Sequence, residues 1–204
     1  LGITSAEEQP VLPKGNNLSL YLLELFTSQV AKVGMTDGIR QVLQEESDAL
    51  RAYYEQAGIL IARPAGGTSC RLAISAKGGT NAENHNHNDV GSYAVALGSE
   101  TMVGDQGGPN SYPGDYFNGD APQKYKIKGS FGHPVPVVDG RTQSSGGKAK
   151  GVVLQKEFTN EKDVFSIDYT SAYSTPNLDK LIRTFVYDRQ GEGNFTVGDE
   201  FTAK

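Results

Sequence analysis

The sequence predicts a mainly β fold, an antiparallel sandwich or a sheet rolled on itself, preceded by a short helical segment. From about residue 58 onward, short apolar runs alternate with glycine and polar turns, a pattern typical of neighbouring antiparallel strands. Before that point, apolar residues recur at helical spacing. The 204 residues include 25 glycines and 10 tyrosines, so the hydrophobic content of 37% indicates a loop-rich β protein rather than a disordered one.

Two helices are expected in the first part of the chain. Residues 18–33 carry apolar side chains close to helical spacing, and Gly34 is a plausible stop. A second helix is predicted over residues 39–54, with Thr36 or Asp37 as its cap. Two helices alone bury little apolar surface, so we expect them to pack on the later sheets or to belong to a larger helical domain.

Ten short segments have the length and residue types of strands, separated by turn residues. They are residues 58–63, 70–75, 92–97, 100–104, 125–128, 136–138, 149–157, 164–169, 180–188 and 194–199. Residues 107–123 are rich in Gly, Pro, Tyr and Asp and are expected to form a long loop. Long loops within compact domains are often functional.

Composition argues against several classes of protein. The net charge is −5, with 19 basic and 24 acidic residues, and no basic stripe of the kind that nucleic-acid binding needs. No stretch approaches the roughly 20 apolar residues of a membrane helix, so we expect no membrane insertion. The single cysteine, Cys70, excludes an internal disulfide and a cysteine-based zinc site.

The histidines carry the clearest chemical signal. The chain has only three, and His85 and His87 lie one residue apart while His133 follows later. If residues 83–93 form a strand, His85 and His87 project from one face of the sheet. His87, His133 and Asp105 together provide two imidazoles and a carboxylate, a ligand set that suits Zn²⁺ and also Fe²⁺ or Mn²⁺. His85 is then either a further metal ligand or a free imidazole.

Two known families have patterns of this kind. The first cupin motif begins Gly-x5-His-x-His, and Gly79 with His85 and His87 has that spacing. The cupin motif then requires a glutamate, whereas residues 91–93 here read Gly-Ser-Tyr. No second cupin motif is recognisable around His133. A cupin would be a complete barrel without the helices and would carry redox-active iron or manganese.

The second resemblance covers more of the chain. Residues 84–93 read Asn-His-Asn-His-Asn-Asp-Val-Gly-Ser-Tyr and, with the preceding Gly78 and Gly79, resemble the signature of the heparinase II/III-like polysaccharide lyases. Residues 104–108 (Gly-Asp-Gln-Gly-Gly) and 132–140 (Gly-His-Pro-Val-Pro-Val-Val-Asp-Gly) are similar to later motifs of that family. Residues 53–60 resemble its entry into the β-sandwich. The motifs follow the family order over roughly residues 53–150.

The resemblance implies a domain organisation. The family joins an N-terminal α/α toroid to a C-terminal antiparallel β-sandwich of the super-sandwich type. Residues 1–52 are therefore expected to be the end of a toroid, and residues 53–204 a sandwich that is incomplete at its C-terminus. A missing strand would leave an exposed edge that favours pairing with another chain, so we also consider a homo-oligomer.

The resemblance also implies a reaction. These enzymes cleave uronate-containing polysaccharides by β-elimination, in which a base removes the C5 proton and an acid protonates the departing O4. His85 matches the sandwich histidine of the cleft, with a role as base or charge-stabilising partner. His87, Asp105 and His133 match the ligands of a zinc ion that braces loops rather than activating water. Family residues of the toroid would lie upstream of Leu1, so the isolated fragment is expected to bind metal without useful lyase activity.

Other candidates in the same region are less well defined. The family has a cleft tyrosine between the second and third metal ligands, and Tyr112, Tyr116 and Tyr125 all lie there. We select Tyr125 as the catalytic candidate. Four basic residues are candidates for contacts to acidic substrate groups, although solvated surface is the favoured interpretation of each: Lys124, Lys126, Lys128 and Arg141.

Taken together, the sequence predicts part of a periplasmic or secreted bacterial polysaccharide lyase that binds structural zinc and an acidic polysaccharide. A non-catalytic β-sandwich that binds carbohydrate or a partner domain is the alternative. The two hypotheses differ in whether turnover requires His85.

Overall fold

Antiparallel sheets make up most of the computed structural model, which describes residues 49–105, 108–109 and 111–204. A five-stranded sheet has the order β1-β2-β3-β5-β6. Its strands are β1 (Arg51–Tyr54), β2 (Ile59–Ala62), β3 (Leu72–Lys77), β5 (Tyr93–Leu97) and β6 (Glu100–Val103). A four-stranded sheet has the order β11-β10-β9-β8. Its strands are β8 (Val152–Phe158), β9 (Lys162–Asp168), β10 (Leu178–Asp188) and β11 (Asn194–Ala203).

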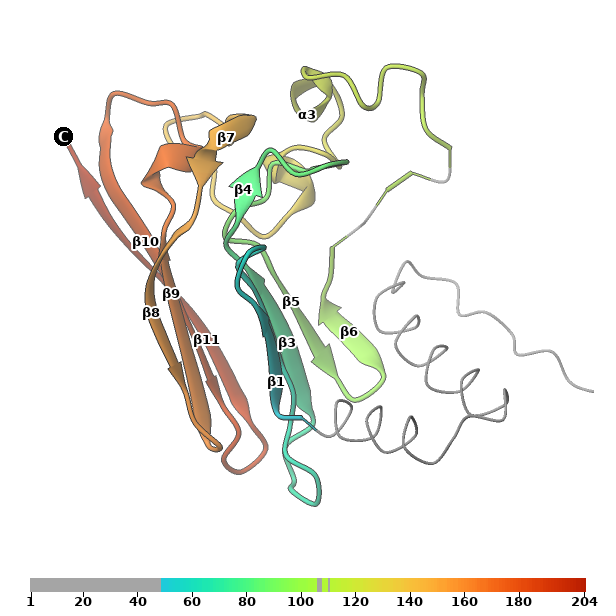
Figure 1. The fold of residues 1–204 in the computed structure, drawn as a ribbon, viewed down its shortest axis with the longest axis vertical. Coiled ribbons are helices and arrows are strands. Elements are labelled where there is room, and N and C mark those ends of the chain that lie inside the picture. The colour runs from blue at the N-terminus through green and yellow to red at the C-terminus, as the bar shows by residue number, and fades with distance from the viewer. Residues whose placement is uncertain (1–48, 106–107, 110) are drawn as a thin grey trace, which may run out of the picture.

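The short elements gather at one end of these sheets, as Figure 1 shows. Strands β4 and β7 form a two-stranded sheet there, close to helix α3. The short elements are β4 (Thr80–Asn81), β7 (Gly146–Lys150), α3 (Ala121–Lys124) and the 3-10 turns η1 (Ser130–Gly132) and η2 (Thr170–Ala172). Among the described residues, no helix has the length and apolar character needed to cross a membrane.

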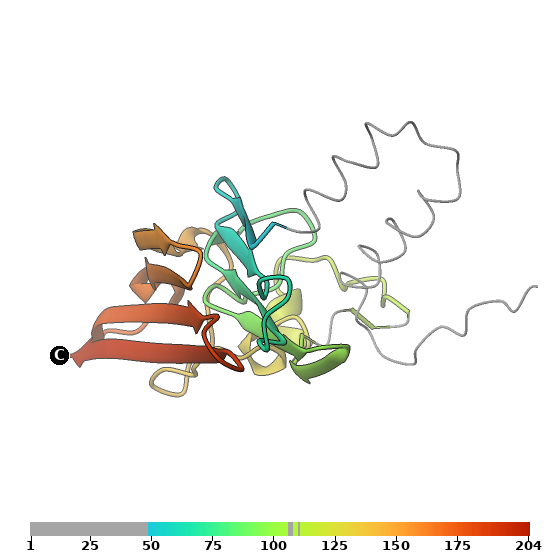
Figure 2. The same cartoon turned by 90° about the horizontal axis from the view of Figure 1, so that it is seen from below.

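The two larger sheets form the layers of a sandwich (Figures 1 and 2). In β3, Ile74 and Ala76 are buried while their neighbours are less so, which is the period-two pattern of a strand with one face inward. Residues of β9 and β10 supply the opposite side of the core, where the rings of Phe165 and Phe185 stack 6.0 Å apart. The predicted antiparallel sandwich is confirmed.

Several predicted elements differ from the structure. Residues 51–54, expected to end a helix, form β1 instead, because they pair with β2 and Tyr53 packs on Phe158 and Phe165. Residues 49 and 50 are not helical either, whereas residues 39–48 of that helix and the whole of the first one lie outside the described residues. Residues 125–128 form turns, and residues 136–138 contribute only the bridge from Val138 to Arg141.

The predicted strand over residues 149–157 divides at Gly151. Residues before it belong to β7, which pairs with β4, and residues after it belong to β8, which pairs with β9. The Gly151 N–H donates to the carbonyl of Gly79 at 2.9 Å, so the chain crosses from one sheet to the other at this point.

One buried arginine joins the sandwich to the loops at its end. Arg183 of β10 is 5% exposed and forms two hydrogen bonds to the Asp199 carboxylate of β11, at 2.6 and 2.8 Å. Its Nη1 also donates to the carbonyls of Gly91 and Pro134, each at 2.8 Å. Planar, bidentate pairing of this kind fixes geometry as well as charge. Arg183 therefore holds the backbone next to two of the loops that contain the histidines.

Gly79 requires the conformational freedom of glycine. Its φ is +66°, and a Cβ atom there would lie 2.5 Å from the carbonyl oxygen of Ala57. The close approach lets the Gly78 N–H donate to the carbonyl of Gly58 at 2.7 Å, which joins the turn after β1 to the start of the histidine loop.

We expect Gly79→Ala to lower the free energy of unfolding by about 1–3 kcal/mol, because the backbone must shift and the φ angle is strained. Gly66→Ala is the matched control, since a Cβ there meets no atom within 4 Å. Urea denaturation of both variants checks this. Equal midpoints for the two variants would contradict the close-approach argument.

Candidate metal centre and cavity

Three loops at the same end of the sandwich supply the predicted site residues. His85 and His87 lie between β4 and β5, Asp105 follows β6, and His133 follows η1. These segments are separated by up to 48 positions in the chain, counted from residue 85 to residue 133. Loops at the end of a rigid sheet scaffold are common positions for functional residues.

The structure brings the three proposed metal ligands together. His87 Nδ1 lies 3.2 Å from His133 Nε2, and His133 Nδ1 lies 2.7 Å from Asp105 Oδ2. One ligand atom from each residue can be chosen so that all lie within 4.8 Å of one another. Zinc–nitrogen distances of about 2.0–2.1 Å in a tetrahedral site put neighbouring ligand atoms roughly 3.3 Å apart. The donor set suits zinc, and the 3.2 Å between His87 Nδ1 and His133 Nε2 is close to this spacing.

The surroundings of His87 favour a neutral, ligand-ready imidazole. Burial lowers the pKa of His87 below its usual value, and the adjacent His133 lowers it further. Its other ring nitrogen, Nε2, lies 3.5 Å from the hydroxyl of buried Tyr116, whose pKa is raised mainly by burial. A hydrogen-bonding group behind a ligating histidine fixes its ring orientation. Tyr116 is in position to do this for His87.

His85 points elsewhere, because the residues around it do not form the strand in which it would share a face with His87. Residues 82–92 form turns and irregular loop, and His85 has a φ of +59°. A non-glycine residue in the left-handed region is uncommon and often marks a functional position. The His85 ring packs against Phe117, with centroids 4.5 Å apart, rather than joining the metal cluster.

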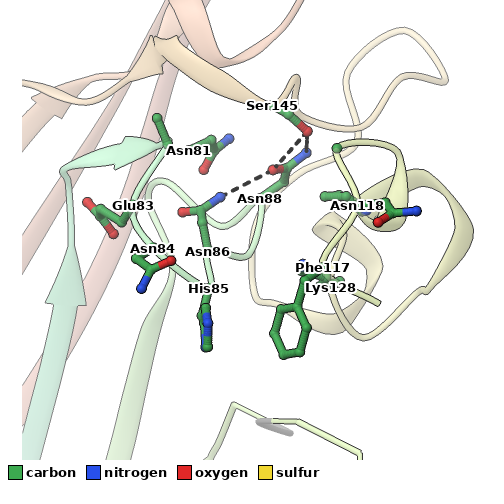
Figure 3. A pocket seen from close by; sticks show the side chains of 13 residues that line it. Asn81, Glu83, Asn84, His85, Asn86, Asn88, Phe117, Asn118, Lys128 and Ser145 are labelled. Atoms are coloured by element: carbon green, nitrogen blue, oxygen red, sulfur yellow. Dashed lines mark hydrogen bonds between the residues drawn. The ribbon is translucent and has the colours of Figure 1, made fainter. Parts of the chain in front are cut away.

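A cavity of about 520 Å³ opens beside His85. Figure 3 shows the side chains around it, with His85 and Phe117 projecting from two different loops. This volume lies within the usual range of about 300–1,000 Å³ for ligand sites. The wall is formed largely by amide, aromatic and charged side chains, including Asn84, His85, Asn86, Phe117, Asn118 and Lys128.

Buried amides hold the histidine loop in place. Asn88, 1% exposed, donates from Nδ2 to the carbonyl of Gln143 and to the hydroxyl of Ser145. Gln143, also 1% exposed, accepts from Asn81 and from the backbone N–H of Val90. Buried polar groups that are paired in this way favour one loop conformation. The loop that bears His85 and His87 is therefore positioned before any ligand binds.

The candidate tyrosines have different surroundings. Tyr125 donates its hydroxyl to Asp115 and is not among the residues that line the cavity. Tyr112 is 55% exposed and packs on Tyr116, which is the tyrosine beside His87. The catalytic role of Tyr125 stays a prediction.

Two residues of the cavity were missed or misread from the sequence. Phe117 was not singled out, although aromatic residues in a glycine-rich loop are a signal that could have found it. Lys128, interpreted as solvated surface, is only 4% exposed, so that interpretation is wrong, whereas Lys126 is exposed as expected. Burial of Lys128 depends on how the loop from Tyr116 folds back, which one-dimensional sequence does not contain.

Comparison with known proteins identifies the fold. No protein-family model and no curated protein sequence matches the chain. The solved structures of heparan sulfate lyase HepC from Pedobacter heparinus and of a mutant of it do match, with TM-scores of 0.63 and 0.64. Each match has 17% sequence identity and covers 90% of this chain but 28% of the lyase chain. The separate open sheets of the described residues are not the closed barrel of the cupin alternative. At this identity the likeness concerns the fold alone, and the fold is that of a heparinase-like polysaccharide lyase.

Proposed function

We propose that this chain is the β-sandwich part of a polysaccharide lyase that cleaves uronate-containing polysaccharides by β-elimination. The observation that carries the proposal is the divergence of two nearby histidines. His85 enters a cavity of about 520 Å³, while His87 joins a two-histidine, one-carboxylate cluster that suits structural zinc. Such a division gives the cavity an imidazole whose position is fixed by its neighbour.

In the proposed reaction, His85 acts on the sugar unit at the cleavage point. Histidine is the side chain best suited to exchange a proton near neutral pH. As base, it would take the C5 proton; the electron pair forms the C4–C5 double bond, and the C4–O4 bond breaks. A second group must protonate the departing O4. Contact with Phe117 limits the orientations that the His85 ring can adopt.

The zinc in this proposal is structural. His87, His133 and Asp105 would hold it, and the bound ion would join the three loops from which they come. An elimination needs no water nucleophile, so a metal that activates water is not required. The residues of this chain do the rest: Asn88 and Gln143 hold the loop, and Tyr116 orients His87.

The lyase fold supports the proposed reaction class. We also propose an acidic polysaccharide as the substrate. The enzyme whose fold this chain resembles is a heparan sulfate lyase by name. Because polymers of this type lie outside the cell membrane of bacteria that degrade them, we also propose a periplasmic or secreted location.

The test is the product formed by the intact protein from uronate polysaccharides. The proposal predicts oligosaccharides with an unsaturated uronate at the new non-reducing end, detected by mass spectrometry. Products that have gained water would indicate a hydrolase. Tight binding without any cleavage would favour the alternative, a carbohydrate-binding sandwich.

A further inference from the structure

Lys128 is a buried cation for which the described part of the chain supplies no carboxylate. Its Nζ donates to the backbone carbonyl of Tyr116 at 2.8 Å and lies over the rings of Tyr116 and Phe117, 4.9 and 5.2 Å from their centroids. Other lysines near the site are paired: Lys77 with Asp89 at 2.6 Å, and Lys124 with Asp115.

A lysine in this position is unusual in energetic terms. An ammonium group has three donors, and the described residues use one of them. Fully buried lysines are rare unless they are paired, because desolvation penalises the charged form. Burial lowers the pKa of Lys128 accordingly. The two aromatic faces offset part of this cost, but they do not replace an anionic partner.

The same side chain lines the cavity that contains His85. An anion bound in this cavity would accept hydrogen bonds from the remaining donors of Lys128, in the same space that His85 lines. Two hydrogen bonds hold the backbone of Lys128 in place. Its carbonyl accepts from the Asn88 N–H at 2.9 Å, and its N–H donates to the carbonyl of Tyr125 at 2.9 Å. The cation is therefore built into the cavity rather than placed there by a flexible surface side chain.

Asn86 adds a second unmet polar group to the cavity wall. Its Oδ1 is buried and has no hydrogen-bond partner among the described residues. Its Nδ2 faces Asn88 Oδ1 at 3.5 Å (Figure 3). This orientation of the Asn86 amide follows from that of Asn88, because Asn88 Nδ2 donates to Gln143 and Ser145 and so leaves its oxygen toward Asn86. An apolar ligand would leave the Asn86 oxygen unpaired, whereas a hydroxylated ligand offers a donor.

We infer that Lys128 is the residue of this cavity that recognises an acidic group, carboxylate or sulfate, on a hydroxylated sugar unit bound beside His85. The inference rests on the proposed function for the reaction that follows binding. It assigns to Lys128 a role in substrate selection: a sugar that carries an acid is bound in preference to its neutral counterpart.

The experiment measures binding by calorimetry with the intact protein. The probes are a size-defined alginate oligosaccharide, which has carboxylates only, and a heparan sulfate oligosaccharide, which has carboxylates and sulfates. Each is compared with its carboxyl-reduced form. Lys128→Met is expected to weaken binding of at least one acidic probe about 10- to 100-fold, the range for a hydrogen bond to a charged group. Binding of carboxyl-reduced alginate, which is neutral, should change little.

Two further variants distinguish recognition from folding. Lys128→Arg keeps the charge and should retain more affinity than Lys128→Met, while Lys126→Met removes an exposed lysine two positions away and should bind like the parent. If Lys128→Met fails to fold, competition on the parent protein between glucuronate, inorganic sulfate and glucose decides: only the anions should displace the oligosaccharide.

The outcomes distinguish carboxylate from sulfate recognition, and the inference about Lys128 from the lyase proposal. A Lys128 effect that survives carboxyl reduction of the heparan sulfate probe identifies sulfate, and one that disappears identifies carboxylate. Equal affinity of Lys128→Met and the parent, or no binding of either acidic probe to the parent, would overturn the inference. Lys128-dependent binding without any unsaturated product would contradict the lyase proposal and leave the inference standing.

Discussion

Replacing Arg183 by methionine is expected to lower the free energy of unfolding by about 3–5 kcal/mol, the largest stability effect that we predict for a single side chain. The change leaves Asp199 without its guanidinium partner and removes donors from the carbonyls of Gly91 and Pro134. The side chain of Asp199 is 32% exposed, so water can solvate the carboxylate once its ion pair is lost. We therefore expect the lower end of this range. Urea denaturation of both proteins measures the difference.

A second ion pair on the same two strands provides the control. Lys180 and Glu200 also join β10 to β11, at 2.9 Å, but their side chains are 43% and 70% exposed. Exposed pairs of this kind contribute about 0–1 kcal/mol, so Lys180→Met should unfold almost like the parent. A loss for Arg183→Met no larger than that for Lys180→Met would mean that Arg183 does not hold the loops as we describe.

Replacing His85 by alanine is expected to lower kcat of the intact protein by about 10²- to 10⁴-fold, the usual contribution of a positioned general acid or base. Because His85 is exposed and packs mainly on Phe117, the fold should tolerate the change. Turnover is measured as the rate at which unsaturated uronate product appears.

Three readouts give this prediction its controls. Zinc content and the unfolding midpoint of His85→Ala should equal those of the parent, because the proposed metal ligands are other residues. Lys126→Met should retain full turnover. An unchanged kcat in His85→Ala would support the non-catalytic sandwich, since a binding module has no need of this imidazole.

The sandwich was predictable because its strands carry their own pattern. In β10, buried and less buried residues alternate along the strand, and its polar turn to β11 is visible in the sequence. Strand β1 was not predictable, because its four residues have no such alternation and become a strand only by pairing with β2. At residues 125–128 turns replace the predicted strand, and contacts of Tyr125 and Lys128 with Tyr116 hold them in place.

The grouping of the three proposed metal ligands was predictable and the cavity was not. With only three histidines in the chain, His87 and His133 are noticed from residue type alone, whereas Asp105 was selected by its motif, and the structure does bring the three together. The separation of His85 from His87 was not predictable, because His85 has a left-handed backbone conformation in a loop, where the alternation of a strand does not apply. Lys128 and Phe117 lie in the cavity through contacts between loops, which spacing along the chain does not encode.

The most direct test of the account is the zinc content of the intact protein, measured by elemental mass spectrometry for the parent, His87→Ala, His133→Ala and His85→Ala. We predict about one equivalent of zinc in the parent and in His85→Ala, and its loss in His87→Ala and His133→Ala. Zinc that remains in those two variants, or that disappears with His85, would contradict the division between metal-holding and cavity histidines.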